Sequence, residues 1–237
     1  MGHAIRIRRR LLAVPLLGLA LGAVAYGLWE PDDDPPRTRT EGVAQPAASR
    51  PTEVVLEESG LRWSDHFGME LPISPVHGPR SLGAGLAGGF ARTPSGALLA
   101  AVHIVVRTAP QWGPKVFEST ISQQVIGPER DVLLASTRDF YERKRAEMGL
   151  AEDAPLGPGY AAIEAYRWHS YSPDVASLDL VSAGPGRHGV TVRAATRVQL
   201  HWADGDWRVL APPGGDWGNT AAAVTSTNGY TLLPGRR

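Results

Sequence analysis

The feature that most constrains this chain is the uncharged, largely apolar run over residues 11–29. A helix that crosses the hydrocarbon core of a bilayer needs about 20 such residues. A basic head, residues 1–10, precedes the run, and an acidic stretch follows it. Because basic residues are retained in the cytoplasm, the sequence predicts a single-pass protein of the cell membrane, with a cytoplasmic N-terminus and an extracytoplasmic C-terminal domain.

A cleaved signal peptide is the alternative interpretation of this run, because Ala23-Val24-Ala25 offers small residues for a cleavage site. The run continues past that site to Trp29 and is longer than the ~7–15 residues of a signal-peptide core. Its length therefore favours a retained transmembrane helix. Under either interpretation the bulk of the chain is expected outside the cytoplasm.

Three regions follow the apolar run. Residues 30–52 are rich in Pro and Asp and are predicted to form an extended linker. Residues 53–217 are long enough for one domain with a substantial core, and residues 218–237 are predicted to be an irregular tail. The 24 Lys and Arg residues balance 24 Asp and Glu residues, which argues against direct nucleic-acid binding. The chain has no cysteine, which excludes disulfides and thiolate metal sites.

Three segments of the domain show helical patterns. Residues 95–108 are almost continuously apolar and have Thr93 or Ser95 as a cap, which predicts a buried helix. Pro114–Gln124 has proline in its first turn, and Asp131–Gly149 predicts an amphipathic helix that ends at its glycine. The apolar stripe of this third helix is expected to contain Val132, Leu133, Ala135, Phe140 and Met148.

The remaining segments predict a loop and then a sheet. Residues 61–92 are rich in Gly and Pro and are predicted to form an ordered loop, held down by Trp63, Phe67 and Phe90. From residue 160 the apolar spacing follows the period of two that marks strands. Four strands are predicted over residues 160–171, 175–183, 189–202 and 206–211, with turns at 184–186 and at Asp204-Gly205. The order predicts an α+β fold, with about three helices on the concave face of a curved antiparallel sheet.

Two sets of residues resemble known proteins. WADGDWRV at residues 202–209 resembles the final hairpin of the cone-shaped, nuclear transport factor two-like fold. Four strings resemble uncharacterised, membrane-anchored actinobacterial proteins associated with integrative and conjugative elements: HGPR (His77–Arg80), GFARTPSGALLAA (Gly89–Ala101), RTAPQWGP (Arg107–Pro114) and GDWRVLAPPGGDW (Gly205–Trp217). The implied architecture also occurs in TcpC-like conjugation proteins and in the inner-membrane assembly factor of type IV secretion.

This resemblance implies a non-enzymatic scaffold or assembly subunit that supports conjugative DNA transfer. Its expected partners are the membrane, other proteins of the transfer machinery and further copies of itself. The resemblance supplies no catalytic, cofactor-binding or metal-ligating residue. The alternative is a small-ligand-binding or enzymatic domain, because enzymes also use the pocket of this cone. An open, polar pocket would favour the alternative, and a pocket filled by Trp and Leu would favour the scaffold.

An enzyme of this shape needs a titratable base held in an apolar cavity. Glu164 is expected to share a sheet face with Tyr166 and to lie across from His201, but no spacing joins two candidates into a known dyad. The separated histidines do not form a metal motif, and Gly83–Gly89 is interpreted as a close-packed turn and not as a phosphate loop. The candidate bases are His103, which is interpreted as a core residue, and Glu164, His169 and His201.

Two tryptophans lie in loops rich in Gly and Pro, Trp112 in APQWGP and Trp217 in GGDWGN. Each is expected either to plug an end of the domain or to contact a protein partner, because Trp is favoured at the centres of protein interfaces. The sequence leaves both alternatives open.

Overall fold

The computed structural model describes residue 56 and residues 60–83, 85–186 and 189–234. The predicted transmembrane run at residues 11–29 and the linker at residues 30–52 lie outside this part of the chain. Within the described part, no helix is both long enough and apolar enough to cross a membrane.

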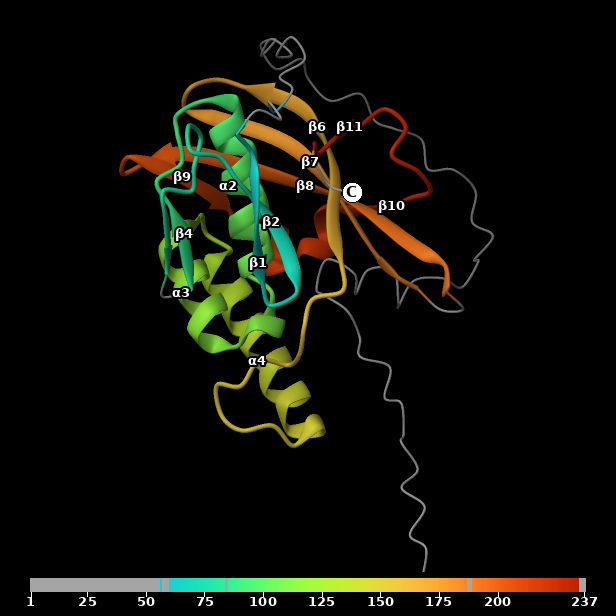
Figure 1. Ribbon diagram of the computed structural model, residues 1–237. Coiled ribbons are helices and arrows are strands. Elements are labelled where there is room, and N and C mark those ends of the chain that lie inside the picture. The colour runs from blue at the N-terminus through green and yellow to red at the C-terminus, as the bar shows by residue number, and fades with distance from the viewer. Residues whose placement is uncertain (1–55, 57–59, 84, 187–188, 235–237) are drawn as a thin grey trace, which may run out of the picture.

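The centre of the fold is a mostly antiparallel sheet, made of β5 (Val125–Ile126), β6 (Ala162–Tyr171), β7 (Val175–Pro185), β8 (Thr191–Ala203), β9 (Asp206–Leu210), β10 (Ala221–Val224) and β11 (Thr231–Leu232). The strand order is β11-β6-β7-β8-β9-β5, and β10 pairs with β8 (Figure 1). The predicted meander is confirmed by β6–β9, which are joined by antiparallel pairing. Asp204 and Gly205 both have positive φ, 53° and 77°, as a tight hairpin turn requires. Because β7 continues to Pro185, the turn predicted at 184–186 begins later than expected.

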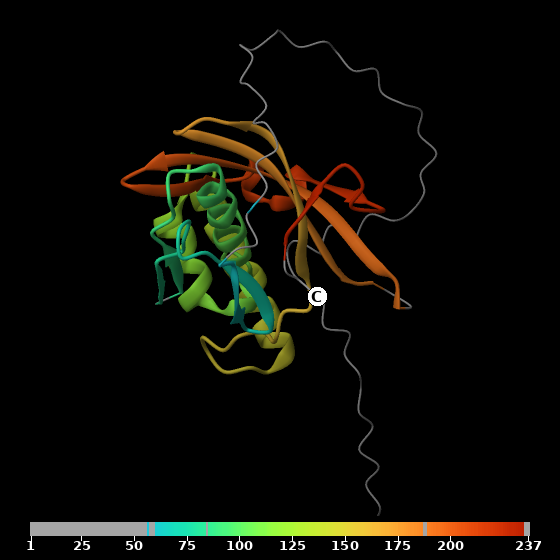
Figure 2. The ribbon, with the colours of Figure 1, turned by 45° about the horizontal axis from the view of Figure 1, so that its top comes forward.

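Three helices cover one side of this sheet, as Figures 1 and 2 show: α2 (Pro94–Arg107), α3 (Pro114–Gln124) and α4 (Arg130–Met148). The three predicted helices are therefore confirmed, and with them the α+β class. The Thr93 hydroxyl caps α2 by accepting the Gly96 N–H at 3.1 Å, and Gly149 ends α4 in the left-handed conformation. The 3-10 helices are η1 (Pro110–Trp112), η3 (Pro213–Gly215) and η4 (Trp217–Thr220).

Helix α2 lies at the centre of the domain, and every residue from Ser95 to Arg107 is buried. The sheet lies against one side of it, and the short strands β2 (Met69–Ile73) and β4 (Leu86–Gly88) lie against others. The close packing requires glycine at position 96, because a Cβ there would lie 2.0 Å from the Ala91 carbonyl oxygen. This cover explains why the helix is apolar around its whole circumference.

The prediction of a loop over residues 61–92 is wrong, because this region forms two hairpins. β1 (Arg62–His66) pairs with β2, and β3 (Ser81–Gly83) pairs with β4. Phe67 occupies the first turn at φ 52° and is 42% exposed, with its ring stacked on that of the buried Trp112 at 5.7 Å between centroids. Phe90 is buried. Gly85, at φ 81°, leaves no room for a side chain, since a Cβ would lie 2.4 Å from the Lys115 carbonyl oxygen. The close-packed turn predicted for Gly83–Gly89 is confirmed.

The apolar stripe predicted for α4 is largely wrong. Its buried residues are Leu133, Thr137 and Tyr141, spaced by four. Val132 and Met148 are 47% and 39% exposed, Ala135 is also exposed, and Phe140 is partly buried. The Tyr141 hydroxyl can be buried because it donates to the Ala154 carbonyl oxygen at 2.9 Å.

The irregular tail predicted for residues 218–237 also needs correction. β10 pairs with β8 from Ala221↔Thr196 to Val224↔Arg193, and β11 pairs with β6 at Thr231↔Tyr166. The small side chains of β10 bury little apolar surface, so its stabilisation comes from main-chain hydrogen bonds. A periodicity of side chains does not reveal such a strand.

Candidate functional site

The two faces of the central sheet carry different side chains, because successive residues of a strand point to opposite faces. On the face covered by the helices, Leu178 and Leu180 of β7 join the main core with Val198 of β8. On the outward face, Asp179 of β7 pairs across from Arg197 of β8. The candidate site lies on the outward face, where the charged side chains gather.

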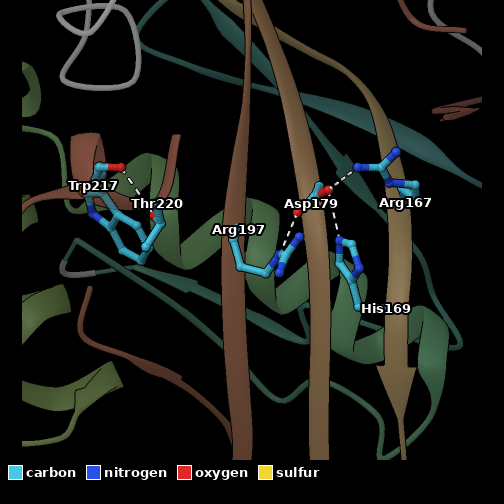
Figure 3. Close-up of polar contacts among 6 residues, drawn as sticks. All are labelled: Arg167, His169, Asp179, Arg197, Trp217 and Thr220. Carbon is cyan, nitrogen blue, oxygen red and sulfur yellow. Dashed lines mark hydrogen bonds and ion pairs between the residues drawn. The ribbon is translucent and has the colours of Figure 1, made fainter. Parts of the chain in front are cut away.

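Asp179 is the centre of an ion cluster on this face (Figure 3). Arg197 Nε donates to its Oδ1 at 2.8 Å, and Arg167 Nη2 donates to its Oδ2 at 2.8 Å. His169 Nε2 lies 2.8 Å from the same Oδ2. We call these four residues the Asp179 cluster.

Strand pairing brings the Asp179 cluster together. Asp179 lies opposite Arg167 in the β6–β7 ladder and opposite Arg197 in the β7–β8 ladder. The β6–β7 register shifts between Trp168 and Ser170, so His169 occupies an irregularity of the strand. Such a bulge re-aims a side chain, and here the imidazole reaches the carboxylate.

The Asp179 cluster keeps its carboxylate ionised. Burial alone would raise the pKa of Asp179, but hydrogen bonds from Arg197, His169 and Arg167 outweigh burial and hold this pKa below its ordinary value. An acid that is ionised and already bonded is a poor proton acceptor. The Asp179 side chain is 6% exposed, whereas those of Arg167 and Arg197 are 44% and 47% exposed. The cluster can therefore offer guanidinium N–H groups to an anion, and it is not arranged as an acid–base site.

The C-terminal strands cover the outward face beside the Asp179 cluster. Val224 and Tyr230 pack on a small apolar group formed by Ala165, Val181 and Ala195. The ring of Tyr230 also lies below the Arg167 guanidinium, 4.5 Å from its central carbon, which is cation–π geometry. The tail thus orients one arginine of the cluster.

An open groove of about 650 Å³ lies at the end of the sheet near the β7–β8 hairpin. Glu164 and Arg193 form an ion pair inside it, with Oε2 and Nε 2.7 Å apart. Its walls include three well-exposed apolar side chains, Tyr160, Val190 and Leu232. A further hollow of about 600 Å³ lies between α4 and the η3–η4 region, where Phe140, Arg143 and Trp217 contribute to its lining.

Trp112 and Trp217 are both buried, with 2% and 5% exposure, as the interpretation as plugs predicts. Trp112 Nε1 donates to the Val106 carbonyl oxygen at 2.5 Å. Trp217 Nε1 donates to the Thr108 hydroxyl at 3.1 Å, and its carbonyl oxygen accepts from Thr220 (Figure 3). Their indole N–H groups are already satisfied at the C-terminal end of α2. The alternative of partner contact needs an exposed ring, which neither tryptophan has.

The predicted candidate bases are scattered over the domain. His103 is fully buried, with Nε2 2.7 Å from the Pro72 carbonyl oxygen and Nδ1 2.8 Å from Arg107 Nη1. Burial and the Arg107 charge lower the pKa of His103 to about 3. The ring is thus neutral, with Nε2 as the donor, which confirms the interpretation as a satisfied core residue.

The expected juxtaposition of Glu164, Tyr166 and His201 is wrong. Glu164 lies at a register shift between Ile163 and Ala165, which takes it off the face that Tyr166 occupies in the core. His201 lies opposite Val175, at the other end of the β7–β8 ladder. Within the described residues, no group of three His, Cys, Asp or Glu side chains is arranged to hold a metal ion.

The Asp179 cluster itself was not predicted, apart from its member His169. Its signal in the sequence is a charged residue on the outward side of each of three consecutive strands. That signal becomes readable only when the strand register is known, because the pairs Arg167–Asp179 and Asp179–Arg197 are 12 and 18 positions apart.

The four strings that carry the sequence resemblance meet around α2. At its N-terminal end, the Ala91 N–H donates to the His77 carbonyl oxygen at 3.0 Å, and Trp207 Nε1 donates to the Ala91 carbonyl oxygen at 3.0 Å. At its C-terminal end, Trp217 bonds to Thr108. These strings therefore hold the fold together, and the Asp179 cluster lies outside them.

A family model described as Domain of unknown function (DUF8175) matches residues 29–232, which is most of the chain. The chain belongs to this family. Comparisons with curated proteins and with solved structures found no match. The central sheet and the Asp179 cluster lie within the matched residues.

Proposed function

We propose that this chain is a non-enzymatic, single-pass membrane scaffold or assembly subunit that supports conjugative DNA transfer. The resemblance of four sequence strings to anchored proteins of conjugative elements supports the biological setting. The apolar run at residues 11–29 supports the placement in the cell membrane, with the domain outside. The finer fold that we propose is the cone-shaped, nuclear transport factor two-like arrangement, supported by helices on one face of an antiparallel sheet.

The observation that carries this proposal is the filled interior between the helices and the sheet. A cone-shaped enzyme holds its pocket there, whereas in this chain the space contains Trp207, Leu98 and Leu200, all 0–1% exposed. On α2, the buried His103 has both ring nitrogens in contact with polar partners, one of them the buried Arg107. An interior of this kind supports the fold, and the side chains available for binding are on the surface.

The outward face of the sheet is the surface that we propose for protein contact. Arg167 and Arg197 are half-exposed and are held in place by Asp179, so little side-chain entropy is lost when they bind a carboxylate. Arginine is also favoured at interface hot spots. Other subunits of a transfer assembly, or further copies of this chain, are the proposed partners.

The experiment that tests this proposal is crosslinking in native membranes, followed by purification of the full-length chain and mass spectrometry of what is recovered. We expect a transfer ATPase or channel subunits. The matched variants are Arg197→Ala on the outward face, which should reduce recovery, and Arg138→Ala on α4, which should not. Recovery of the chain alone, without crosslinked oligomers of it, would overturn the scaffold role and lead to ligand screening of the two hollows.

A further inference from the structure

The hollow of about 600 Å³ between α4 and the η3–η4 region has the size of a small-molecule site. One face of α4 lines it with Leu133, Thr137, Phe140 and Arg143, and Trp217 contributes from the loop that contains η3 and η4. Every lining residue belongs to the described part of the chain. The hollow can therefore be read side chain by side chain.

Contacts within the protein hold the walls of this hollow in place. The loop meets α4 at Gly215, where a Cβ would lie 2.5 Å from the Leu133 main-chain nitrogen. Ser136 Oγ donates to the Gly215 carbonyl oxygen at 3.3 Å, and Asn219 Nδ2 donates to the Pro213 carbonyl oxygen at 2.8 Å. Because the walls are fixed before a ligand arrives, little ordering entropy is lost on binding.

Arg143 is the one cation of α4 that no carboxylate neutralises among the described residues. The other cations of this helix are all paired: Arg130 with Asp131, Arg138 with Glu118, Lys144 with Glu147 and Arg145 with Glu142. Arg143 instead lines the hollow. A free guanidinium fits a carboxylate through two parallel hydrogen bonds, so this wall suits an anionic group.

Asp216 supplies the opposite charge from the loop side of the hollow. Its Oδ1 accepts the Gly218 N–H at 2.8 Å and caps η4, but no cation within residues 60–83, 85–186 and 189–234 forms an ion pair with it. Arg143 lines the same hollow and does not reach it. Two opposite charges that face one hollow and do not neutralise each other fit a ligand that carries both.

The hollow also offers apolar surface and a free hydroxyl. Phe140 is partly buried and packs on the main core, which also contains Leu133, so the two give an apolar side chain a firm surface. Thr137 is 7% exposed, and its hydroxyl bonds to no other residue that the structure describes. Because a shielded polar group without a partner is costly, a ligand that bonds to this hydroxyl gains affinity.

We propose that this hollow binds a small zwitterion with an apolar side chain, which is a free amino acid or a short peptide. The ligand carboxylate pairs with Arg143, its ammonium group pairs with Asp216, and its side chain lies against Phe140. The Thr137 hydroxyl adds one hydrogen bond. The binding does not rest on the proposed scaffold function, because the surface proposed for protein contact is the outward face of the sheet.

The test is isothermal titration calorimetry on the full chain in detergent micelles, with L-phenylalanine and L-alanyl-L-phenylalanine as probes. We expect binding, and the tighter probe distinguishes an amino acid from a peptide as the ligand. Arg143→Gln and Asp216→Asn should each weaken binding about tenfold, because each removes a charged partner, and asparagine can still cap η4. The matched control is Arg138→Gln, on the same helix and outside the hollow, which should leave binding unchanged.

Modified forms of the bound probe show which end each residue holds. The C-terminal amide lacks the carboxylate, so Arg143→Gln should no longer weaken its binding. The N-acetyl form lacks the ammonium group, so Asp216→Asn should no longer matter. The proposal is overturned if neither probe binds, if the modified forms bind as tightly as the free probe, or if the control loses as much affinity as Arg143→Gln. Recovery of a transfer assembly by crosslinking, together with any of these results, would retain the scaffold and remove only the ligand site.

Discussion

On β7, Leu178 and Leu180 are buried in the main core, while Asp179 between them belongs to an ion cluster that faces outward. The strands β6, β7 and β8 thus have two different faces. One is a dry face under the helices, and the other is a charged face that the C-terminal strands partly cover. On the dry face, stability depends on side chains that fill the interior and on hydrogen-bond partners for the buried polar groups. On the charged face, two half-exposed arginines depend on one carboxylate and one aromatic ring for their orientation. The contrast separates residues that maintain the fold from residues that are available for recognition.

The largest expected effect comes from the dry face. Trp207→Ala removes a fully buried indole and its hydrogen bond to Ala91, and should lower the free energy of unfolding by about 3–5 kcal/mol. Val175→Ala on the outward face, where the side chain is 42% exposed, should change it by less than about 0.5 kcal/mol. Chemical denaturation followed by circular dichroism measures both. Similar losses in the two variants would refute the distinction between the faces.

Acid should weaken the interior through His103. The pKa of its imidazole is about 3 in the folded chain and near 6.5 when unfolded. The unfolded state therefore binds more protons between these values, and stability falls as the pH drops from 6.5 towards 3. The loss reaches about 2 kcal/mol at pH 5 relative to pH 8.

The variant that tests this dependence is His103→Gln, whose amide can replace both ring contacts. Chemical denaturation at pH 8 and pH 5 measures the free energy of unfolding at each pH. The difference between the two values should be smaller in the variant than in the parent. His66, whose pKa is also lowered to about 3 by burial and by Arg107, contributes with the same sign, so part of the dependence remains. If the variant and the parent lose the same stability between pH 8 and pH 5, His103 is not the group responsible for the acid dependence.

An intermediate effect is expected for Asp179→Asn, which weakens the bonds to Arg167 and Arg197. At pH 7 the variant should lose about 1–2 kcal/mol. Glu142→Gln, which removes an exposed ion pair with Arg145 on α4, should cost less than about 0.5 kcal/mol. The pKa of Asp179 is lowered by folding, so its contribution is present above the unfolded value near 4 and is lost as the pH falls through the folded value. The thermal unfolding midpoints of parent and variant should therefore converge in acid. A difference in midpoint that widens in acid would contradict the stabilising role of the Asp179 carboxylate.

The smallest effect concerns the ring that supports the cluster. Tyr230→Leu keeps apolar contact with the outward face and removes the cation–π contact with Arg167, at a cost of about 0.5–1 kcal/mol. Tyr230→Phe keeps the ring and should be close to neutral. Equal stability of the two variants in urea denaturation would mean that the ring only covers the surface.

The sequence predicted the parts of the fold that have long, regular patterns. α2 and the strands β6–β9 are extended enough for their apolar periodicity to stand out, and Thr93 and Gly149 mark helix ends by local chemistry. The hairpins before α2 are short and contain the Gly and Pro residues that usually indicate loops. The strand β10 is built of alanine and valine and carries too few large apolar side chains to show a period.

The candidate site was harder to predict because it depends on register. Arg167 and Arg197 become neighbours of Asp179 only after β6, β7 and β8 pair as they do. Trp112 and Trp217 illustrate the opposite case, because their Gly- and Pro-rich surroundings suggested accessible loops. The polar groups at the C-terminal end of α2, the Val106 carbonyl and the Thr108 hydroxyl, instead accept their indole N–H groups inside the fold.

The complete cover of α2 has a consequence for how the domain is assembled. The surfaces that shield this apolar helix come from both sides of it in the sequence, from β2 and β4 before it and from β7–β9 up to a hundred residues after it. During synthesis the helix is therefore complete long before its cover exists. Such non-local contacts slow folding and leave apolar surface exposed to aggregation in the interval. We expect the domain to acquire its core late, when β9 has emerged, with α2 as the segment most in need of protection until then.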